Sequence, residues 1–194
     1  NTTGYNNTAV GKSSLLTNTT GVNNTAHGLG ALQLNTTGAS NVAVGLNSLN
    51  ANTTASNNTA VGYNSLIANT TGSENTAVGY QSGAANTTGT ENAAFGHTAL
   101  YGNTTGNYNA SFGRGSMYNS TTGSNNTAVG HTALVLNTTG DNNTAVGYEA
   151  GYSNTTGTRL TAFGYQAGKA HVATGNVQNV FVGNEAGIGN TTGV

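Results

Sequence analysis

The stretch NTTGYNNTAVGKSSLLT at residues 1–17 decides the fold, because the chain of 194 residues repeats it along its whole length. The glycine that follows its Ala-Val pair, Gly11, returns every 17 residues as far as Gly164, and the last copy, Gly183, follows after 19. Self-similarity at a fixed period of this kind is the signature of a repeat architecture. The unit reads N-T-T-G-x-N-N-T-A-V-G-x-x-S/A-L-x-x, and eleven copies of it predict one array over residues 1–194.

The boundaries of the array follow from the phase of the repeat. Coils should begin near residues 1, 18, 35, 52, 69, 86, 103, 120, 137, 154 and 171, with a partial repeat at 190–194. Since both ends of the chain show the same N-T-T-G phase, we expect an excerpt of a longer array. The two extra residues fall between His171 and Val182, where we expect a bulge or another local irregularity.

The residue types of the unit favour strand over helix. Each repeat is rich in Gly, Asn and Thr, which are poor residues for the interior of a helix. Thr8-Ala9-Val10 is a short β-prone run that Gly11 closes, and a second short strand is expected near residues 14–16. Asn and Gly in residues 18–21 suit a turn, because they accept left-handed backbone angles at little cost. The fold class predicted is an all-β parallel solenoid, with two short strands per coil.

A coil of this size leaves no room for an internal active site. At about 3.3 Å per residue its circumference is at most roughly 56 Å, and eleven stacked coils form a rod roughly 50 Å long. The residues expected inside are small, and they recur as Ala9, Ala26, Ala43, Ala60 and Ala77, and as Ser14, Ala31, Ser48, Ser65 and Ser82. We therefore expect no enzyme activity, no cofactor and no metal.

The apolar pair in the strand predicts association between chains. Neighbouring strand residues face opposite ways, so if Ala9 fills the coil, its neighbour Val10 faces outward. The Leu15 column adds further apolar surface, and a stripe of this length is larger than a soluble monomer normally exposes. We expect a homo-oligomer, with three chains as the expected number. The predicted interface consists of Val10, Val44, Val61, Val78, Phe95, Phe112, Val129, Val146 and Phe163.

The composition excludes several classes of partner. Charged residues make up 5% of the chain and the formal net charge is −1. A nucleic-acid-binding or anionic-membrane-binding surface needs a basic patch, so we expect no nucleic acid and no membrane contact in this segment. No run of apolar residues approaches the length of a membrane span.

The motif N-T-A-V-G-x-x-S-L at residues 7–15 and 58–66, with a related copy at 126–134, carries a family resemblance. It resembles the head repeats of trimeric autotransporter adhesins (YadA-like heads), and similar repeats occur in phage tail-fibre-like proteins. The resemblance implies a left-handed parallel β-roll in a homotrimer. It also implies an extracellular place, on a cell surface or a virion fibre, and adhesion to host matrix, glycan or another surface.

The Asn-Thr-Thr turn matches the pattern that accepts N-linked sugar. Two interpretations stay open: outward asparagines that carry glycans, or turn asparagines whose stacked side chains form hydrogen-bonded ladders. A second set of such motifs begins at Asn6, Asn23, Asn57, Asn125 and Asn142. The turn asparagines of the first set are Asn1, Asn18, Asn35, Asn52, Asn69, Asn86, Asn103, Asn119, Asn137, Asn154 and Asn190.

The position after the repeated glycine holds mostly flat side chains in the middle and later coils. The simpler interpretation of such a ladder is mutual stacking that stabilises the rod. The ladder is also a candidate surface for a glycan or another polymer, which it would bind by ring stacking. The candidate residues are Tyr63, Tyr80, His97, Arg114, His131, Tyr148 and Tyr165.

A second function class remains open on the sequence. Thr2 and Thr3 recur in every regular turn, and such columns suit a flat ice-binding or surface-binding face. The two hypotheses are therefore a structural or adhesive fibre and, as the alternative, an ice- or surface-binding solenoid.

Overall fold

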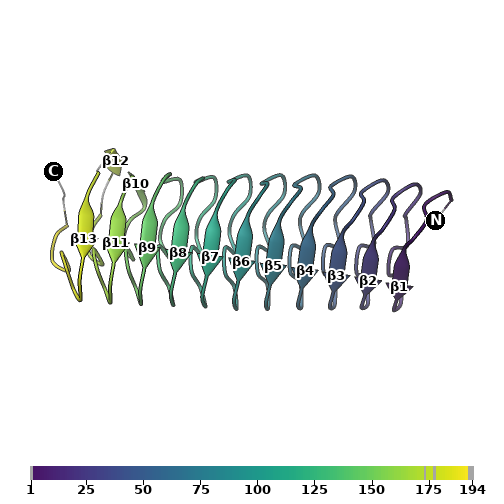
Figure 1. Cartoon of the computed structure of the whole chain (residues 1–194), viewed down its shortest axis with the longest axis horizontal. Helices are drawn as coiled ribbons and strands as arrows, with labels where there is room; N and C mark the ends of the chain where they lie inside the picture. Colours follow the sequence, from purple (N-terminus) through teal and green to yellow (C-terminus); the bar gives the residue numbers. More distant parts are fainter. Residues whose placement is uncertain (1, 173, 177, 192–194) are drawn as a thin grey trace.

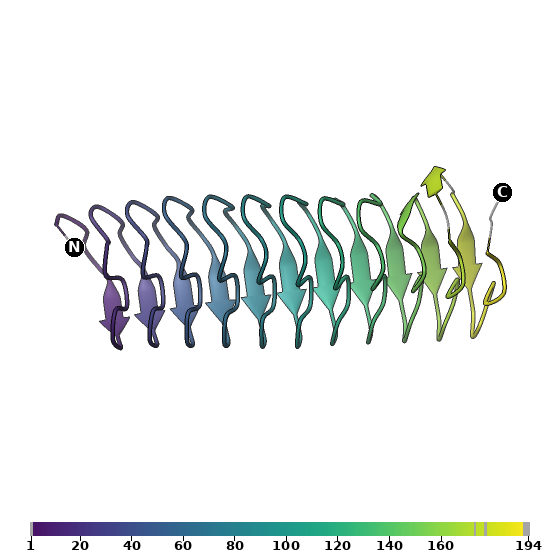
Figure 2. The same cartoon turned by 180° about the vertical axis from the view of Figure 1, so that it is seen from behind.

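The computed structural model describes residues 2–172, 174–176 and 178–191. The chain winds into a straight row of stacked coils, seen from opposite sides in Figures 1 and 2. No helix is present in this part of the chain. The architecture is a parallel β-solenoid, as the repeat predicted.

Each strand is three residues long and occupies the same place in its coil. The strands are β1 (Thr8–Val10), β2 (Thr25–His27), β3 (Val42–Val44), β4 (Thr59–Val61), β5 (Thr76–Val78), β6 (Ala93–Phe95), β7 (Ala110–Phe112), β8 (Thr127–Val129), β9 (Thr144–Val146), β10 (Thr156–Thr158), β11 (Thr161–Phe163), β12 (Thr174–Asn176) and β13 (Val180–Val182).

Eleven of these strands form one parallel sheet in the order β1 to β9, β11 and β13. The register is set by the repeat, so that Thr59 pairs with Thr76 and Ala60 with Ala77. Ten turns of the chain separate the eleven strands, nine of 17 residues and the last, from Thr161 to Val180, of 19. Every position in one coil therefore lies beside its own copy in the next.

The middle residue of each regular strand faces the interior and its two neighbours face outward. Ala26, Ala43, Ala60 and Ala77 are buried, which confirms the predicted small-residue column, whereas Ala9 in the first coil is exposed. Ala31, Ser48, Ser65 and Ser82 are also buried. Because the buried side chains at these positions are small, the interior of each coil is narrow.

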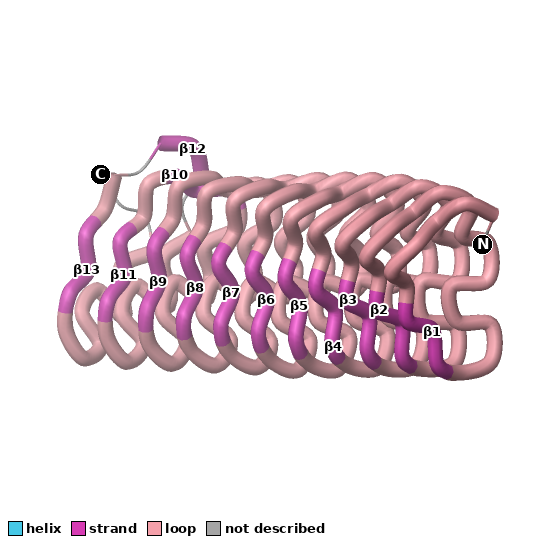
Figure 3. The backbone as a smooth tube through the Cα atoms, turned by 45° about the vertical axis from the view of Figure 1, so that its right-hand side comes forward, coloured by secondary structure: helices cyan, strands magenta, loops and turns pink. Residues whose placement is uncertain are grey.

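The second strand expected near residues 14–16 is absent, and this prediction was wrong. Residues 12–17 form a turn, and Leu15 has a left-handed backbone with φ of 49°. Figure 3 accordingly shows strand along one side of the regular coils, with β10 and β12 apart from that row near the end of the rod. Left-handed backbone at alternate positions, such as Asn47 and Leu49, curls the chain sharply and prevents an extended segment.

This turn also corrects the expected place of the leucines. We predicted that the Leu15 column would add to the outer apolar surface, but it lies in the core. Its members are at most 7% exposed and pack with the alanine column. The turned backbone directs these side chains inward, where they supply most of the apolar volume. The leucine positions are Leu15, Leu32, Leu49, Leu66, Leu100 and Leu134.

Buried asparagines form a second interior component. Asn69 donates to Asn52 Oδ1 of the preceding coil and to the Gly72 carbonyl of its own turn, at 3.2 and 2.8 Å, and it accepts from Asn86 Nδ2 at 2.8 Å. A parallel column that includes Asn58 and Asn75 bonds to backbone N–H groups of the next coil. The asparagine side chains thus satisfy one another and the turn.

The first of these columns, which contains Asn52, Asn69 and Asn86, is interrupted in the eighth coil, where Ser120 stands in place of asparagine. The serine side chain is too short to reach Asn103 in the preceding coil. Ser120 Oγ and Asn103 Oδ1 are therefore buried without a hydrogen-bond partner. Asn137, the next member, donates only to its own turn at Gly140 within the described residues.

The last described coils depart from the regular pattern, as the two extra residues predicted. β10 and β12 pair as a separate two-stranded sheet, and β12 projects from the row of coils in Figure 1. His171 is buried at the asparagine position and meets Phe181 edge-on, with ring centroids 5.3 Å apart. Residues 173 and 177 of this stretch lie outside the described residues.

Replacing Gly62 with valine should destabilise the rod. Gly62 has φ of 134°, and a Cβ there would collide with the Gly79 carbonyl, whose carbon would lie 2.8 Å away. We expect a loss on the order of 1–3 kcal/mol or more, measured as a lower midpoint of thermal or urea unfolding. Gly189→Val is the matched control, because nothing lies within 4 Å of its added Cβ. An unchanged midpoint for Gly62→Val would contradict the close approach of the coils.

Replacing Ser120 with asparagine should stabilise the rod. The new amide would donate to Asn103 Oδ1 and accept from Asn137, which restores the ladder of the neighbouring coils. A buried hydrogen bond contributes about 1 kcal/mol, so a gain of about 1–2 kcal/mol is expected in urea unfolding. Asn69→Ala should act in the opposite direction by a similar or larger amount, because it leaves Asn52 Oδ1 unpaired. A less stable Ser120→Asn chain would argue against the ladder.

Candidate functional site: the outer side-chain ladders

The residue after each repeated glycine points away from the core and forms a ladder on the surface. Tyr63 stacks on Tyr80 with ring centroids 5.2 Å apart, and Tyr80 stacks on His97 at 4.8 Å. Later in the chain, His131 stacks on Tyr148 at 5.5 Å and Tyr148 on Tyr165 at 5.4 Å. The ring faces are covered by neighbouring rings, which leaves the ring edges and the phenol hydroxyls for solvent.

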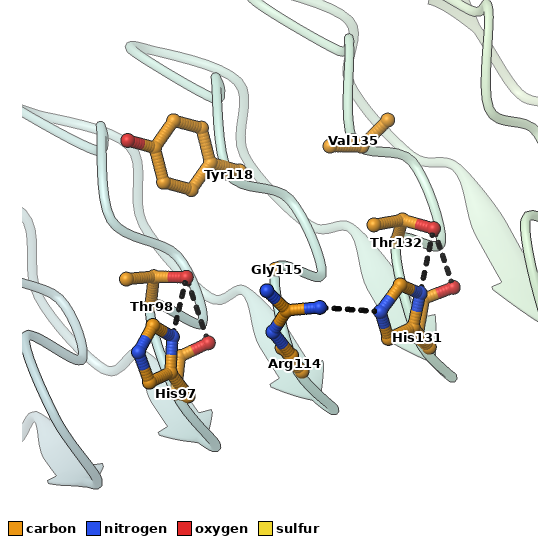
Figure 4. A pocket seen from close by; sticks show the side chains of 8 residues that line it. All are labelled: His97, Thr98, Arg114, Gly115, Tyr118, His131, Thr132 and Val135. Atoms are coloured by element: carbon orange, nitrogen blue, oxygen red, sulfur yellow. Dashed lines mark hydrogen bonds between the residues drawn. The ribbon is translucent and has the colours of Figure 1, made fainter.

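The ladder is interrupted at Arg114, which lies between the two stacks. Its Nη1 donates to Nε2 of His131 at 3.1 Å, as Figure 4 shows. Beside it lies a cavity of about 340 Å³. The residues that line the cavity are His97, Thr98, Arg114, Gly115, Tyr118, His131, Thr132 and Val135.

The hydrogen bonds of the two threonines assign the histidine tautomers. Thr132 donates its hydroxyl proton to the His131 carbonyl at 2.8 Å, so its oxygen accepts from His131 Nδ1 at 3.1 Å. Nε2 of His131 is then the acceptor that Arg114 requires. Thr98 and His97 repeat the same arrangement. The bond from Arg114 therefore makes Nε2 of His131 an acceptor, whereas Nε2 of His97 has no hydrogen-bond partner among the described residues, and Arg114 is the permanently charged group of the cavity.

The sequence alone identified the ladder residues but missed the cavity. Thr98, Gly115, Tyr118, Thr132 and Val135 were not singled out. A signal was present, because Gly115 occupies a position that holds threonine in the coils on both sides. The side chains around that gap become neighbours only when the coils stack.

The predicted interface stripe lies on the outer face of the sheet. Val10, Phe112, Val129 and Phe163 are 51%, 39%, 38% and 55% exposed. The intermediate members are half-buried by their own neighbours: Val44, Val61, Val78, Phe95 and Val146. Phe95 and Phe112 stack with centroids 5.0 Å apart. From Val44 to Phe163 the stripe is an unbroken row of apolar side chains, and His27 separates it from Val10.

Of the two interpretations of the first set of turn asparagines, the regular coils show the hydrogen-bonded ladder. In these coils the asparagine side chains are at most 2% exposed and form the internal ladder, so the folded rod does not present them to a modifying enzyme. Asn119 is half-buried and Asn190 is exposed, while Asn1 lies outside the described residues. The buried members are Asn18, Asn35, Asn52, Asn69, Asn86, Asn103, Asn137 and Asn154. The second set, at Asn6, Asn23, Asn57, Asn125 and Asn142, is exposed.

The two threonine columns of the turn differ in their availability. Thr19 Oγ1 donates to the Thr36 carbonyl of the next coil at 2.9 Å, and its copies repeat this bond. The following residue, Thr20, is exposed, as are Thr37, Thr54 and Thr71. The outer column is therefore a regular row of free hydroxyl and methyl groups, and the inner column belongs to the backbone network.

Two oppositely charged side chains of neighbouring coils form an ion pair. Lys169 Nζ lies 2.6 Å from Glu149 Oε2, and Gln166 donates to the same oxygen at 2.8 Å. The hydrogen bond from Lys169 lowers the pKa of Glu149, and the same bond raises the pKa of Lys169. This is a surface ion pair that links neighbouring coils. No group of three metal-ligating side chains occurs in the part of the chain that the structure describes.

Comparison with known proteins adds no relative. No protein-family model, no curated protein and no solved structure matches this chain. The resemblance to adhesin head repeats therefore depends on the repeat residues alone. Over the described ranges, no helix has the length and apolarity needed to cross a membrane.

Proposed function

We propose that the chain is a segment of an extracellular structural or adhesive fibre, in which copies of the chain associate along the outer Val/Phe stripe. The observation that carries the proposal is the stripe itself, which runs over strands β1 to β9 and β11 with His27 as its polar interruption. Apolar patches of this extent mark interaction surfaces in soluble proteins.

A second copy of the chain is the partner that fits this stripe. Side chains along it recur once per coil, at about 4.8 Å. A partner must offer apolar groups at the same spacing to fill every position, and another copy does so along its whole length. Self-association through identical patches is also the common rule for oligomers. Three chains is the number that the repeat resemblance implies.

The remaining features support a passive rod. In the described coils the interior is filled by alanine, leucine and asparagine side chains, which leaves no internal space for a substrate. A place on a cell surface or a virion fibre is supported by the resemblance of the N-T-A-V-G repeats. Sugar attached to such a fibre would fall on the exposed second set, which includes Asn57 and Asn125, rather than on the buried ladder.

Charge placed in the stripe should separate the chains. Sedimentation velocity of the 194-residue chain should show an assembly, with three chains expected. Val61→Asp with Val78→Asp should give monomers or unfolded chain, because each unpaired buried charge costs several kcal/mol. Thr54→Asp with Thr71→Asp is the matched control on the exposed turn of the same coils, and it should leave the assembly intact. A stable, folded wild-type monomer would refute the proposal.

The exposed threonine column favours one second candidate, an ice- or surface-binding face. Thr20, Thr37, Thr54 and Thr71 lie on consecutive coils with free side chains. A surface that binds an ordered lattice such as ice needs groups at a regular spacing. This row presents methyl and hydroxyl groups at one spacing along the rod.

Thermal hysteresis separates the two candidates. A fibre segment should show no gap between the freezing and melting points of its solution, at any concentration. An ice-binding face should show a gap that Thr37→Lys with Thr54→Lys abolishes, because the long charged side chains disrupt the row. A gap that depends on these threonines would replace the fibre proposal with the second candidate.

A further inference from the structure

We infer that the cavity at Arg114 is a binding site for an acidic sugar, whose carboxylate pairs with the Arg114 guanidinium while the saccharide lies along the ladder. This inference adds a ligand class to the adhesive role proposed above. A rod that only bears load could exist without it, so the two proposals are tested separately.

The cavity exists because one coil departs from its neighbours at two adjacent positions. Arg114 stands where the flanking coils carry His97 and His131, and Gly115 stands where they carry Thr98 and Thr132. A Cβ built on Gly115 meets only a methyl group of Thr132, at 3.4 Å. The missing side chain thus opens the surface beside the arginine. Gly30 is the other glycine at this position of the repeat, but the residue before it is Leu29 rather than an arginine.

Arg114 is available for an anion. It is one of the four Lys and Arg residues of the chain, and Lys169 is already paired with Glu149. Within the described residues no carboxylate lies within salt-bridge distance of Arg114, and its guanidinium makes one side-chain hydrogen bond, to neutral His131. The other N–H donors keep the planar geometry that binds a carboxylate through two parallel hydrogen bonds.

The walls of the cavity suit a sugar ring better than a bare ion. Tyr118 stacks on Tyr101 at 4.9 Å on one side, and the next member of that column is Val135, which has no ring. The hydroxyl protons of Thr98 and Thr132 are used on backbone carbonyls. The cavity therefore combines one cation with aromatic and aliphatic surface. A volume of about 340 Å³ is at the lower end of the range for small-ligand sites.

The stacks on either side of the cavity extend the site along the rod. Tyr80 lies beyond His97 and is 45% exposed, and Tyr148 lies beyond His131 and is 42% exposed. Because their ring faces are covered by stacking, their hydroxyl groups and edges are what a ligand meets, and the Tyr148 hydroxyl, which hydrogen-bonds to Glu149, is left as an acceptor for a sugar hydroxyl. Phenol hydroxyls both donate and accept hydrogen bonds, as sugar hydroxyls require. A short acidic oligosaccharide can thus bond to tyrosines on both sides of the arginine.

Calorimetric or NMR titration of the 194-residue chain tests the site, with galacturonic acid and its linear trimer as probes. Galactose is the neutral control, and sodium sulfate is the control for a bare anion. We expect saturable binding of galacturonate, tighter binding of the trimer, and no binding of galactose. Gly115→Thr, which copies the flanking coils, and Arg114→Tyr, which completes the stack, should each weaken binding about tenfold or more.

Both variants should remain folded. Gly115→Thr should lower the unfolding midpoint slightly, because it places a β-branched residue at φ of 64°, a conformation that Thr98 and Thr132 already adopt at 54° and 52°. Arg114→Tyr places a ring where the coils on both sides carry His97 and His131. If Arg114→Tyr alters folding, Gly115→Thr alone decides. Tyr80→Phe with Tyr148→Phe keeps the stacks and should weaken the trimer but not the monomer. The inference is overturned if nothing binds, if sulfate binds as tightly as galacturonate, or if Gly115→Thr binds normally. None of these results changes the expected sedimentation of the fibre.

Discussion

The hydrogen bonds between successive coils are the constraint on which the rest of this structure depends. The backbone N–H of Thr59 donates to the Asn75 carbonyl, and the N–H of Gly62 donates to Val44, each at 2.8 Å. The same bonds recur along the rod, so each coil must lie one strand spacing from the next. Glycine is required where this approach is closest, because a Cβ on Gly62 would occupy the place of the Gly79 carbonyl.

Stacking at one spacing forces each side chain against its own copy. Residues that interact well with themselves are therefore favoured, and the rod is built from alanine, leucine, asparagine and aromatic columns. Like charges would be stacked in the same way, which accounts for a charged content of only 5%. A substitution in one coil affects both neighbouring contacts, as Ser120 does in the asparagine ladder.

This regularity also determines where specific recognition can arise. Columns that keep one chemical character over many coils, such as the Val/Phe stripe, suit a partner with the same period, and the proposed association between copies follows from that match. A single ligand needs a place that differs from the rest of the rod. Arg114 and Gly115 supply such a place, because together they remove a ring and a side chain from between coils that carry histidine and threonine at these positions.

The period, the parallel solenoid, the glycine positions, the alanine column and the outward stripe all followed from the sequence, because a 17-residue repeat with one short β-prone run determines which residues meet. The sequence did not show that the turn after each strand is left-handed at Leu15 and its copies, since leucine rarely adopts that backbone. Only the packed coils decide this: burial of leucine in the core offsets the local strain. The same packing directs the turn asparagines inward and brings Arg114, Tyr118 and Val135 around one cavity, contacts that no linear pattern contains.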